Sequence, residues 1–560
     1  MSADTATLPA TWDWLDARAR AFSVQRVLTA LPLVLILAVQ AALTIRLMPY
    51  VGSDHGDEAI YIFGGHQLIY ELLHGGGSPY YETWYSGAPV VYPVIAAIAD
   101  SIGGLIAARA LSVVFMLGAT ALLFLTGRRL FGYWVGVTAA ALFAGLGVTQ
   151  NLGALATFDG MSLALMACAA YAAVRGVSST RWLLMVPVFL LAANAAKYMS
   201  VIFDPVVIGL AAFQLIPDGW SRVGRRVLSL SSVTILLTGL AVFLAGAAYY
   251  QGIMFTTLAR KGGHQSVFGA QLTSVSTIGS LSWEWIGAVF ALGVLGLLVL
   301  LARRSELRTN GPVLILLIVA GLLVTLGNIH LRTDQSMFKH DDFGAWFGCI
   351  AAAYGLASIA DATRNWQVKA PVLAIAAVAT GLSGYHYSQL SNMHVYFGRE
   401  TLTEYQTTWT FLAPYLKPGD AEYLLASKDE TTMVYGDHVP LHWWQLTEDT
   451  YIKYPIPGRG GDVYGHATGL VCGDAPLPSP ANPHCMYLEG LSAYSTAIHA
   501  HWFALVTMVH DHGLGSDAVI LAAVKSTPGY VQISDQDGAP TFIYAPDYPA
   551  WEREHTTEVQ

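Results

Sequence analysis

The stretch SDHGDEAIYIFGGHQLI, residues 53–69, places two adjacent carboxylates, Asp57 and Glu58, directly after a hydrophobic segment at residues 27–45. That segment is long enough to cross a bilayer. Arginines precede it and it has no clear small-residue cleavage site, so we expect a retained first transmembrane helix rather than a signal peptide. The two carboxylates then lie at a membrane boundary, where the first helix of the following loop begins.

The composition is that of a polytopic membrane protein. Of the 560 residues, 54% are hydrophobic and only 12% are charged, which excludes an ordinary soluble enzyme. Ten further segments, uncharged apart from Asp204 in one of them, are long enough to span a membrane, some with one end buried in protein. They are residues 110–127, 133–148, 160–174, 182–196, 198–216, 227–249, 285–302, 311–328, 343–360 and 370–387. We therefore expect about eleven spans.

Basic residues set the orientation of these spans. If the N-terminus is cytoplasmic, the inner loops hold 15 Lys and Arg residues and the outer loops hold 7. Positive residues collect on the cytoplasmic side of membrane proteins. The sequence thus predicts a multi-pass plasma-membrane protein with a cytoplasmic N-terminus and an extracytoplasmic C-terminal region.

One apolar segment, PVVYPVIAAIADSIGGLIAA at residues 89–108, would reverse every later loop if it crossed the membrane. It contains Asp100, two prolines and the pair Gly103 and Gly104. We place it at the outer interface. The first outer loop, about residues 47–109, then carries two interfacial helices, and the opening stretch begins the first of them.

The chain changes character after Tyr387, where polar and aromatic residues mix and no further span appears. Strand-like runs are AEYLLAS (421–427), VILAAV (519–524) and GAPTFIYAP (538–546), and helix-like runs are TLTEYQTTWTFLAPYL (401–416) and STAIHAHWFALVTMVHDH (495–512). We expect a membrane domain at residues 1–387 and a soluble extracytoplasmic α/β domain at residues 388–560. Cys472 and Cys485 flank a Pro-rich loop in that outer domain, which favours a disulfide.

Charged residues gather at the outer ends of the expected spans. Besides Asp57 and Glu58, they are Asp159, Lys197, Arg260, Lys261, His264, Arg332, Lys339 and His340. The loops that carry them could converge on one cavity. The chain has no Walker loop, HExxH or CxxC pattern, and nothing in it indicates nucleic-acid binding.

The order of these motifs resembles a known family. An Asp-Glu pair follows the first span, the second span ends in the basic run TGRRLFG, Asp159 begins the fourth span and Lys197 follows the fifth. Over residues 27–390 this is similar to the GT-C class of lipid-dependent glycosyltransferases, especially the protein O-mannosyltransferases and the lipid A aminoarabinose transferases. A soluble domain after the last span resembles the aminoarabinose branch. The resemblance implies a mostly α, polytopic GT-C fold.

The resemblance also implies the chemistry. Such enzymes transfer a sugar from a polyprenyl-phosphate donor to an acceptor, here an envelope glycan, a lipid or a protein hydroxyl. The phosphate leaves without a proton, so an inverting transfer needs one base, expected to be Asp57, with Glu58 and Asp159 in the same site. Cations would hold the donor phosphate; the candidates are Lys197, Arg260, Lys261, Arg332, Lys339 and His340. No cofactor is required, although Glu82 and His264 could bind a divalent metal ion beside the site.

Each assignment has an alternative. The carboxylates could cap helix N-termini, and Lys197 could pair with Asp204, seven residues on and on the same helical face. The other cations could contact lipid headgroups. Two other classes of protein are alternatives to a glycosyltransferase: a membrane transporter and a non-catalytic envelope assembly protein. A transporter is expected to carry charges at mid-membrane, whereas only Asp204 lies clearly within an expected span.

Overall fold

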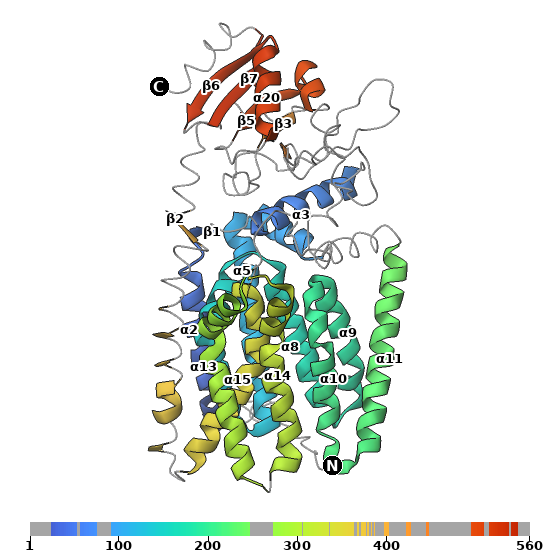
Figure 1. Ribbon diagram of the computed structural model, residues 1–560, viewed down its shortest axis with the longest axis vertical. Helices are drawn as coiled ribbons and strands as arrows, with labels where there is room; N and C mark the ends of the chain where they lie inside the picture. The colour runs from blue at the N-terminus through green and yellow to red at the C-terminus, as the bar shows by residue number, and fades with distance from the viewer. Residues whose placement is uncertain are drawn as a thin grey trace, which may run out of the picture.

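A helical bundle makes up most of the computed structural model, with one helix lying across its end and a small sheet domain beyond that helix (Figure 1). The structure describes residues 24–52, 57–74, 91–246, 273–304, 306–334 and 337–362, short pieces between 367 and 386, and residues 397–401, 422–426, 444–446, 494–508, 515–536 and 539–546.

Each of the first ten expected spans falls on a helix of the bundle. The helices are α2 (Val24–Ile45), α5 (Val91–Phe131), α6 (Tyr133–Gly145), α7 (Gly147–Ala154), α8 (Phe158–Gly176), α9 (Thr180–Ala196), η1 (Tyr198–Phe203), α10 (Asp204–Phe213), η2 (Ile216–Asp218), α11 (Trp220–Ala245), α13 (Val275–Ala302), α14 (Leu307–Leu331) and α15 (Met337–Ala362). Within the described residues, five helices are long and apolar enough to cross a membrane, and α6 with α7, bent by 66°, would make a sixth. The chain is a multi-pass membrane protein, and the full count of eleven spans stays a prediction.

Helix α15 forms the centre of the bundle because its sequence is apolar and small on nearly every face. Its Trp346 is fully buried and donates a hydrogen bond to the carbonyl of Ala119 in α5 (3.0 Å). Glycines bring its backbone against α13: a Cβ atom at Gly355 would lie 2.8 Å from the carbonyl oxygen of Leu292. Small residues at helix contacts are the usual packing device inside membranes.

Helix α5 breaks at the glycine pair that the sequence analysis singled out. Gly104 has φ of 65°, a conformation that L side chains rarely adopt, and the helical geometry stops there. The arm that precedes the break packs against α3 (Asp57–His74), which crosses the end of the bundle (Figure 1). His66 of α3 and Asp100 of α5 form a hydrogen bond of 2.8 Å. The structure thus contains the two predicted helices of the first loop.

The C-terminal region contains a five-stranded sheet in the order β4-β3-β5-β7-β6. Its strands are β3 (Glu422–Ala426), β4 (Trp444–Leu446), β5 (Phe503–Met508), β6 (Tyr530–Gln536) and β7 (Ala539–Tyr544). Strand β3 is parallel to β4 and β5, whereas β7 is antiparallel to β5 and β6. A separate antiparallel pair joins β1 (Tyr50–Gly52) to β2 (Phe397–Thr401). The pair ties the start of the first loop to the chain that follows the membrane region.

Two predicted elements of this domain were wrong. The run 519–524 lies in helix α20 (Gly515–Ser526), in which Ile520, Ala523 and Val524 are buried at helical spacing. Residues 503–508, predicted as helix, form β5, a central strand buried on both faces. A continuous apolar run fits either element, and only the neighbouring strands decide between them. The predicted strands at 421–427 and 538–546 are confirmed as β3 and β7.

Candidate active site

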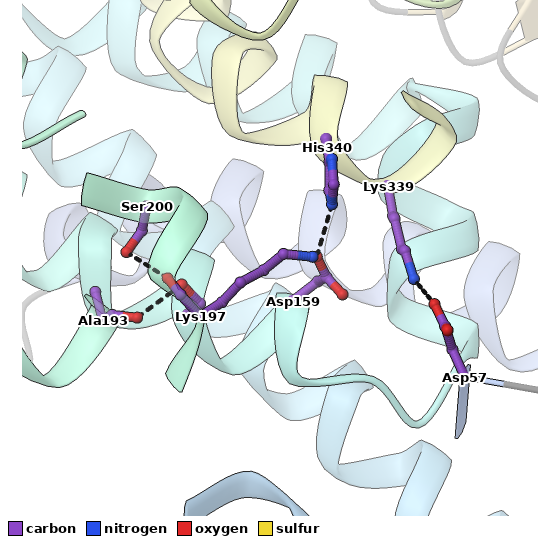
Figure 2. A network of polar contacts seen from close by, with 8 residues as sticks. Asp57, Asp159, Ala193, Lys197, Ser200, Lys339 and His340 are labelled. Carbon is purple, nitrogen blue, oxygen red and sulfur yellow. Dashed lines mark hydrogen bonds and ion pairs between the residues drawn. The ribbon is translucent and has the colours of Figure 1, made fainter. Parts of the chain in front are cut away.

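Acidic and basic side chains from four separate parts of the chain meet where α3 lies over the bundle. Figure 2 shows Asp57 at the start of α3, Asp159 in the first turn of α8, Lys197 after α9, and Lys339 with His340 in the first turn of α15. The sequence proposed all five as site residues, and the fold brings them together. We call these five residues the acid–base cluster.

Asp159 and Lys197 form a buried ion pair in this cluster. Asp159 is fully buried and Lys197 is 3% exposed. The Lys197 ammonium also lies 4.7 Å from the centroid of the Phe158 ring, a favourable cation–π distance. Burying an ion pair costs desolvation energy. The presence of this pair where α9 ends therefore favours a functional role over a purely stabilising one.

The alternative that paired Lys197 with Asp204 is wrong. Lys197 has φ of −155°, an extended conformation that ends α9 before η1 begins, so residues 197 and 204 do not share one helical face. Asp204 instead accepts a hydrogen bond from the Asn194 amide (3.0 Å).

Asp57 forms an ion pair with Lys339 from the other side of the cluster. The Lys339 side chain is 3% exposed, whereas that of Asp57 is 30% exposed. His340, on the next residue of α15, places Nε2 3.9 Å from Asp159 Oδ1. Of the two carboxylates in the cluster, Asp57 is therefore the one that an incoming molecule can reach.

Glu58 forms a third ion pair, with Arg109, outside the acid–base cluster. Arg109 of α5 donates from Nε to Glu58 Oε2 (3.0 Å) and contacts the other carboxylate oxygen, and the amide of Ala156 also donates to Oε2 (2.9 Å). Arg109 further donates to the carbonyl oxygens of Met48 and Tyr50. Arg109 is fully buried and Glu58 is 4% exposed. This geometry suits a residue that fixes the start of α3, and it differs from the catalytic place expected for Glu58.

Arg109 and the two aspartates after His340 also lie beside this region, although the sequence pattern did not predict a role for them. Arg109 was counted only as an outer-loop cation, although it stands alone in the apolar run IAARALSVV, a pattern that signals a buried partner. Asp341 and Asp342 are fully buried beside the cluster. Asp342 accepts a hydrogen bond from Thr149 (2.6 Å), and Asp341 accepts one from Ser282 (3.1 Å).

One further candidate lies within the described residues, and it does not take part in the polar contacts of Figure 2. Arg332 is described, and it caps the end of α14 in a left-handed conformation with an exposed side chain. Arg260, Lys261, Glu82, His264, Cys472 and Cys485 lie outside the described residues. Within the described residues, no three His, Cys, Asp or Glu side chains are grouped so that they could hold a metal ion.

Residues 87–245 match the family model described as dolichyl-phosphate-mannose-protein mannosyltransferase. The predicted family resemblance is confirmed over this segment. The same match supports the predicted class of enzyme, a glycosyltransferase. The matched segment begins just before α5 and ends with α11, so it includes Arg109, Asp159 and Lys197. No curated protein matches the chain by sequence.

The whole chain is similar in structure to ArnT from Cupriavidus metallidurans. The crystal structure bound to undecaprenyl phosphate aligns with a TM-score of 0.58 at 12% identity and covers 96% of this chain and 99% of that one. The apo crystal structure aligns with a TM-score of 0.56 at 13% identity and covers 94% and 99%. At this identity the likeness shows a shared fold. The chain is therefore a mostly helical, multi-pass membrane protein with an ArnT-like fold and a small C-terminal sheet.

Proposed function

We propose that this protein transfers a sugar from a polyprenyl-phosphate donor to an acceptor hydroxyl at the outer face of the membrane, with Asp57 as the base. The observation that carries the proposal is the acid–base cluster, in which a partly exposed carboxylate lies beside two buried lysines. Undecaprenyl phosphate is the molecule bound in the structurally similar ArnT, which supports a donor of this class.

The chemistry follows from the charges. The acceptor oxygen attacks the anomeric carbon, the bond from that carbon to the phosphate oxygen breaks, and the acceptor proton passes to the Asp57 carboxylate. The polyprenyl phosphate leaves as an anion, so it needs cations rather than a proton donor. Attack from the face opposite the phosphate inverts the anomeric centre.

Lys339 has two roles in this scheme. Without donor, it forms an ion pair with Asp57 and occupies a carboxylate oxygen that could accept the proton. An arriving phosphate would compete for the Lys339 ammonium and release Asp57 to accept the proton. Asp159, held by Lys197 and near His340, would orient the acceptor or the base. Glu58 and Arg109 would act as positioning residues that fix the helix carrying Asp57.

The outer-face assignment can be tested by cysteine labelling. Thr496, in the C-terminal domain, and Arg225, at the opposite end of the bundle in α11, are both exposed. In intact cells, we expect a cysteine at position 496 to react with a membrane-impermeant thiol reagent and one at position 225 to react only after lysis. The reverse pattern would place the acid–base cluster on the cytoplasmic side and overturn this part of the proposal.

Donor recognition can be tested with Lys197→Ala. Charge-assisted hydrogen bonds contribute about 1.5–3 kcal/mol, so we expect the affinity for polyprenyl phosphate to fall by roughly 10- to 100-fold. Lys525→Ala, which removes an exposed lysine from the last turn of α20, is the matched control and should bind as the wild type does. Equal affinity in wild type and Lys197→Ala, with both proteins monodisperse, would remove Lys197 from the donor site.

A further inference from the structure

A polar cavity lies at the other end of the bundle from the acid–base cluster. It encloses about 410 Å³ where the end of α13 and the start of α14 approach the start of α6 and the last turns of α15. Its lining includes Ser358, and the cluster residue Lys339 stands at the start of the same helix. At about 1.5 Å per residue the two positions are roughly 29 Å apart. The cavity is therefore no part of the site already described.

Two opposite charges are held in fixed positions in this cavity. Arg303 donates a hydrogen bond to the carbonyl of the buried Ser358 (2.8 Å). Glu306 Oε2 accepts hydrogen bonds from Tyr354 (3.1 Å) and Asn310 (3.2 Å). The other carboxylate oxygen, Oε1, lies 3.8 Å from Arg303 Nη1, which is longer than a hydrogen bond. Both charged side chains stay partly exposed, at 33% for Arg303 and 41% for Glu306.

Aromatic rings complete the lining. Tyr133 and Trp134 lie at the start of α6 with their ring centroids 5.5 Å apart, and Phe131 packs 4.9 Å from Tyr354. Arg128 already lies 6.0 Å from the centroid of the Tyr133 ring, so this ring accepts a cation. Trp134 is 36% exposed. Tyr and Trp at such a position are typical of the membrane–water interface.

We infer that this cavity binds the headgroup of a zwitterionic phospholipid that carries a primary ammonium, from the leaflet at this end of the bundle. The phosphate would contact the Arg303 guanidinium, and the ammonium would donate to Glu306 Oε1 beside the Tyr133 and Trp134 rings. A purely anionic headgroup would place negative charge against Glu306, and a cation alone would bring no negative charge to the Arg303 guanidinium. The volume is in the range of small-molecule sites.

The test is native mass spectrometry of the full-length protein with equal amounts of phosphatidylethanolamine and phosphatidylglycerol. We expect the wild type to retain phosphatidylethanolamine in preference. In the double variant Arg303→Gln/Glu306→Gln, that retention should fall by at least about tenfold, because both charge-assisted contacts of the headgroup are lost. Glu306→Gln alone keeps an amide oxygen for Tyr354 and Asn310, and it should lose the preference for the ammonium lipid while remaining folded.

A matched control is Asp218→Asn/Arg222→Gln. It removes an exposed ion pair of 3.0 Å between Asp218 in η2 and Arg222 in the first turn of α11. It should retain the ethanolamine lipid as the wild type does. Equal retention of both lipids by the wild type would overturn the inference. So would an unchanged preference in Glu306→Gln, or an equal loss in the control variant.

Discussion

Replacing Asp57 with Asn should lower sugar transfer by at least about 10²-fold, the usual contribution of a general base. Asparagine is nearly the same size and can still form a hydrogen bond, but it cannot take up a proton. The substitution also removes the ion pair between Asp57 and the Lys339 ammonium. Donor affinity should therefore be retained or increased, which separates a lost base from a lost binding site.

The measurement is a transfer rate and a donor affinity on the same preparation. Asp334→Asn is the matched control. Asp334 is an exposed carboxylate in the segment that leads into α15, and it accepts a hydrogen bond from the Thr273 hydroxyl (2.9 Å). It should transfer sugar at the wild-type rate. If Asp57→Asn has a normal size-exclusion profile and a near wild-type rate, Asp57 is not the base.

Arg109→Met should lower the free energy of unfolding by about 3–5 kcal/mol, because it removes the Arg109 partner of the buried Glu58 carboxylate. The same change removes the donors that hold the carbonyl oxygens of Met48 and Tyr50. The double variant Arg109→Met/Glu58→Leu should recover part of this loss, since an apolar pair can replace a buried ion pair. Thermal unfolding of the purified proteins measures both effects.

This cycle also separates stability from positioning. The double variant should be more stable than Arg109→Met and still transfer sugar slowly, because α3 would lose the contacts that place Asp57. A wild-type melting temperature for Arg109→Met would show that the ion pair contributes little. A wild-type transfer rate for the stable double variant would remove the positioning role.

Local sequence features predicted the parts of the fold that depend on local physics. The membrane helices follow from long apolar runs, and the break in α5 follows from Gly103 and Gly104, because only glycine adopts the backbone angles found at position 104 without strain. The start of α3 at Asp57 agrees with the expected beginning of the first loop helix. The strands β3 and β7 were likewise recognisable from their composition.

The errors concern contacts between distant parts of the chain. Lys197 was compared with Asp204 because both are near in sequence, but its partner Asp159 lies on another helix, and the extended backbone at residue 197 separates it from α10. The pairing of Glu58 with Arg109 joins residues that are 51 positions apart. Strand β5 forms only because β3 and β7 flank it. The predicted membrane side of the charged residues indicated the five residues of the acid–base cluster, but not which charges pair with each other.

The most direct test of the proposed transfer is to reconstitute the protein in vesicles with a polyprenyl-phosphate sugar and to measure released polyprenyl phosphate by mass spectrometry. We expect the wild-type protein to release polyprenyl phosphate together with a new glycoside, and Asp57→Asn to bind the donor without cleaving it. Recovery of an intact donor from the wild type, bound or moved across the membrane but never cleaved, would contradict a glycosyltransferase and favour a lipid transporter.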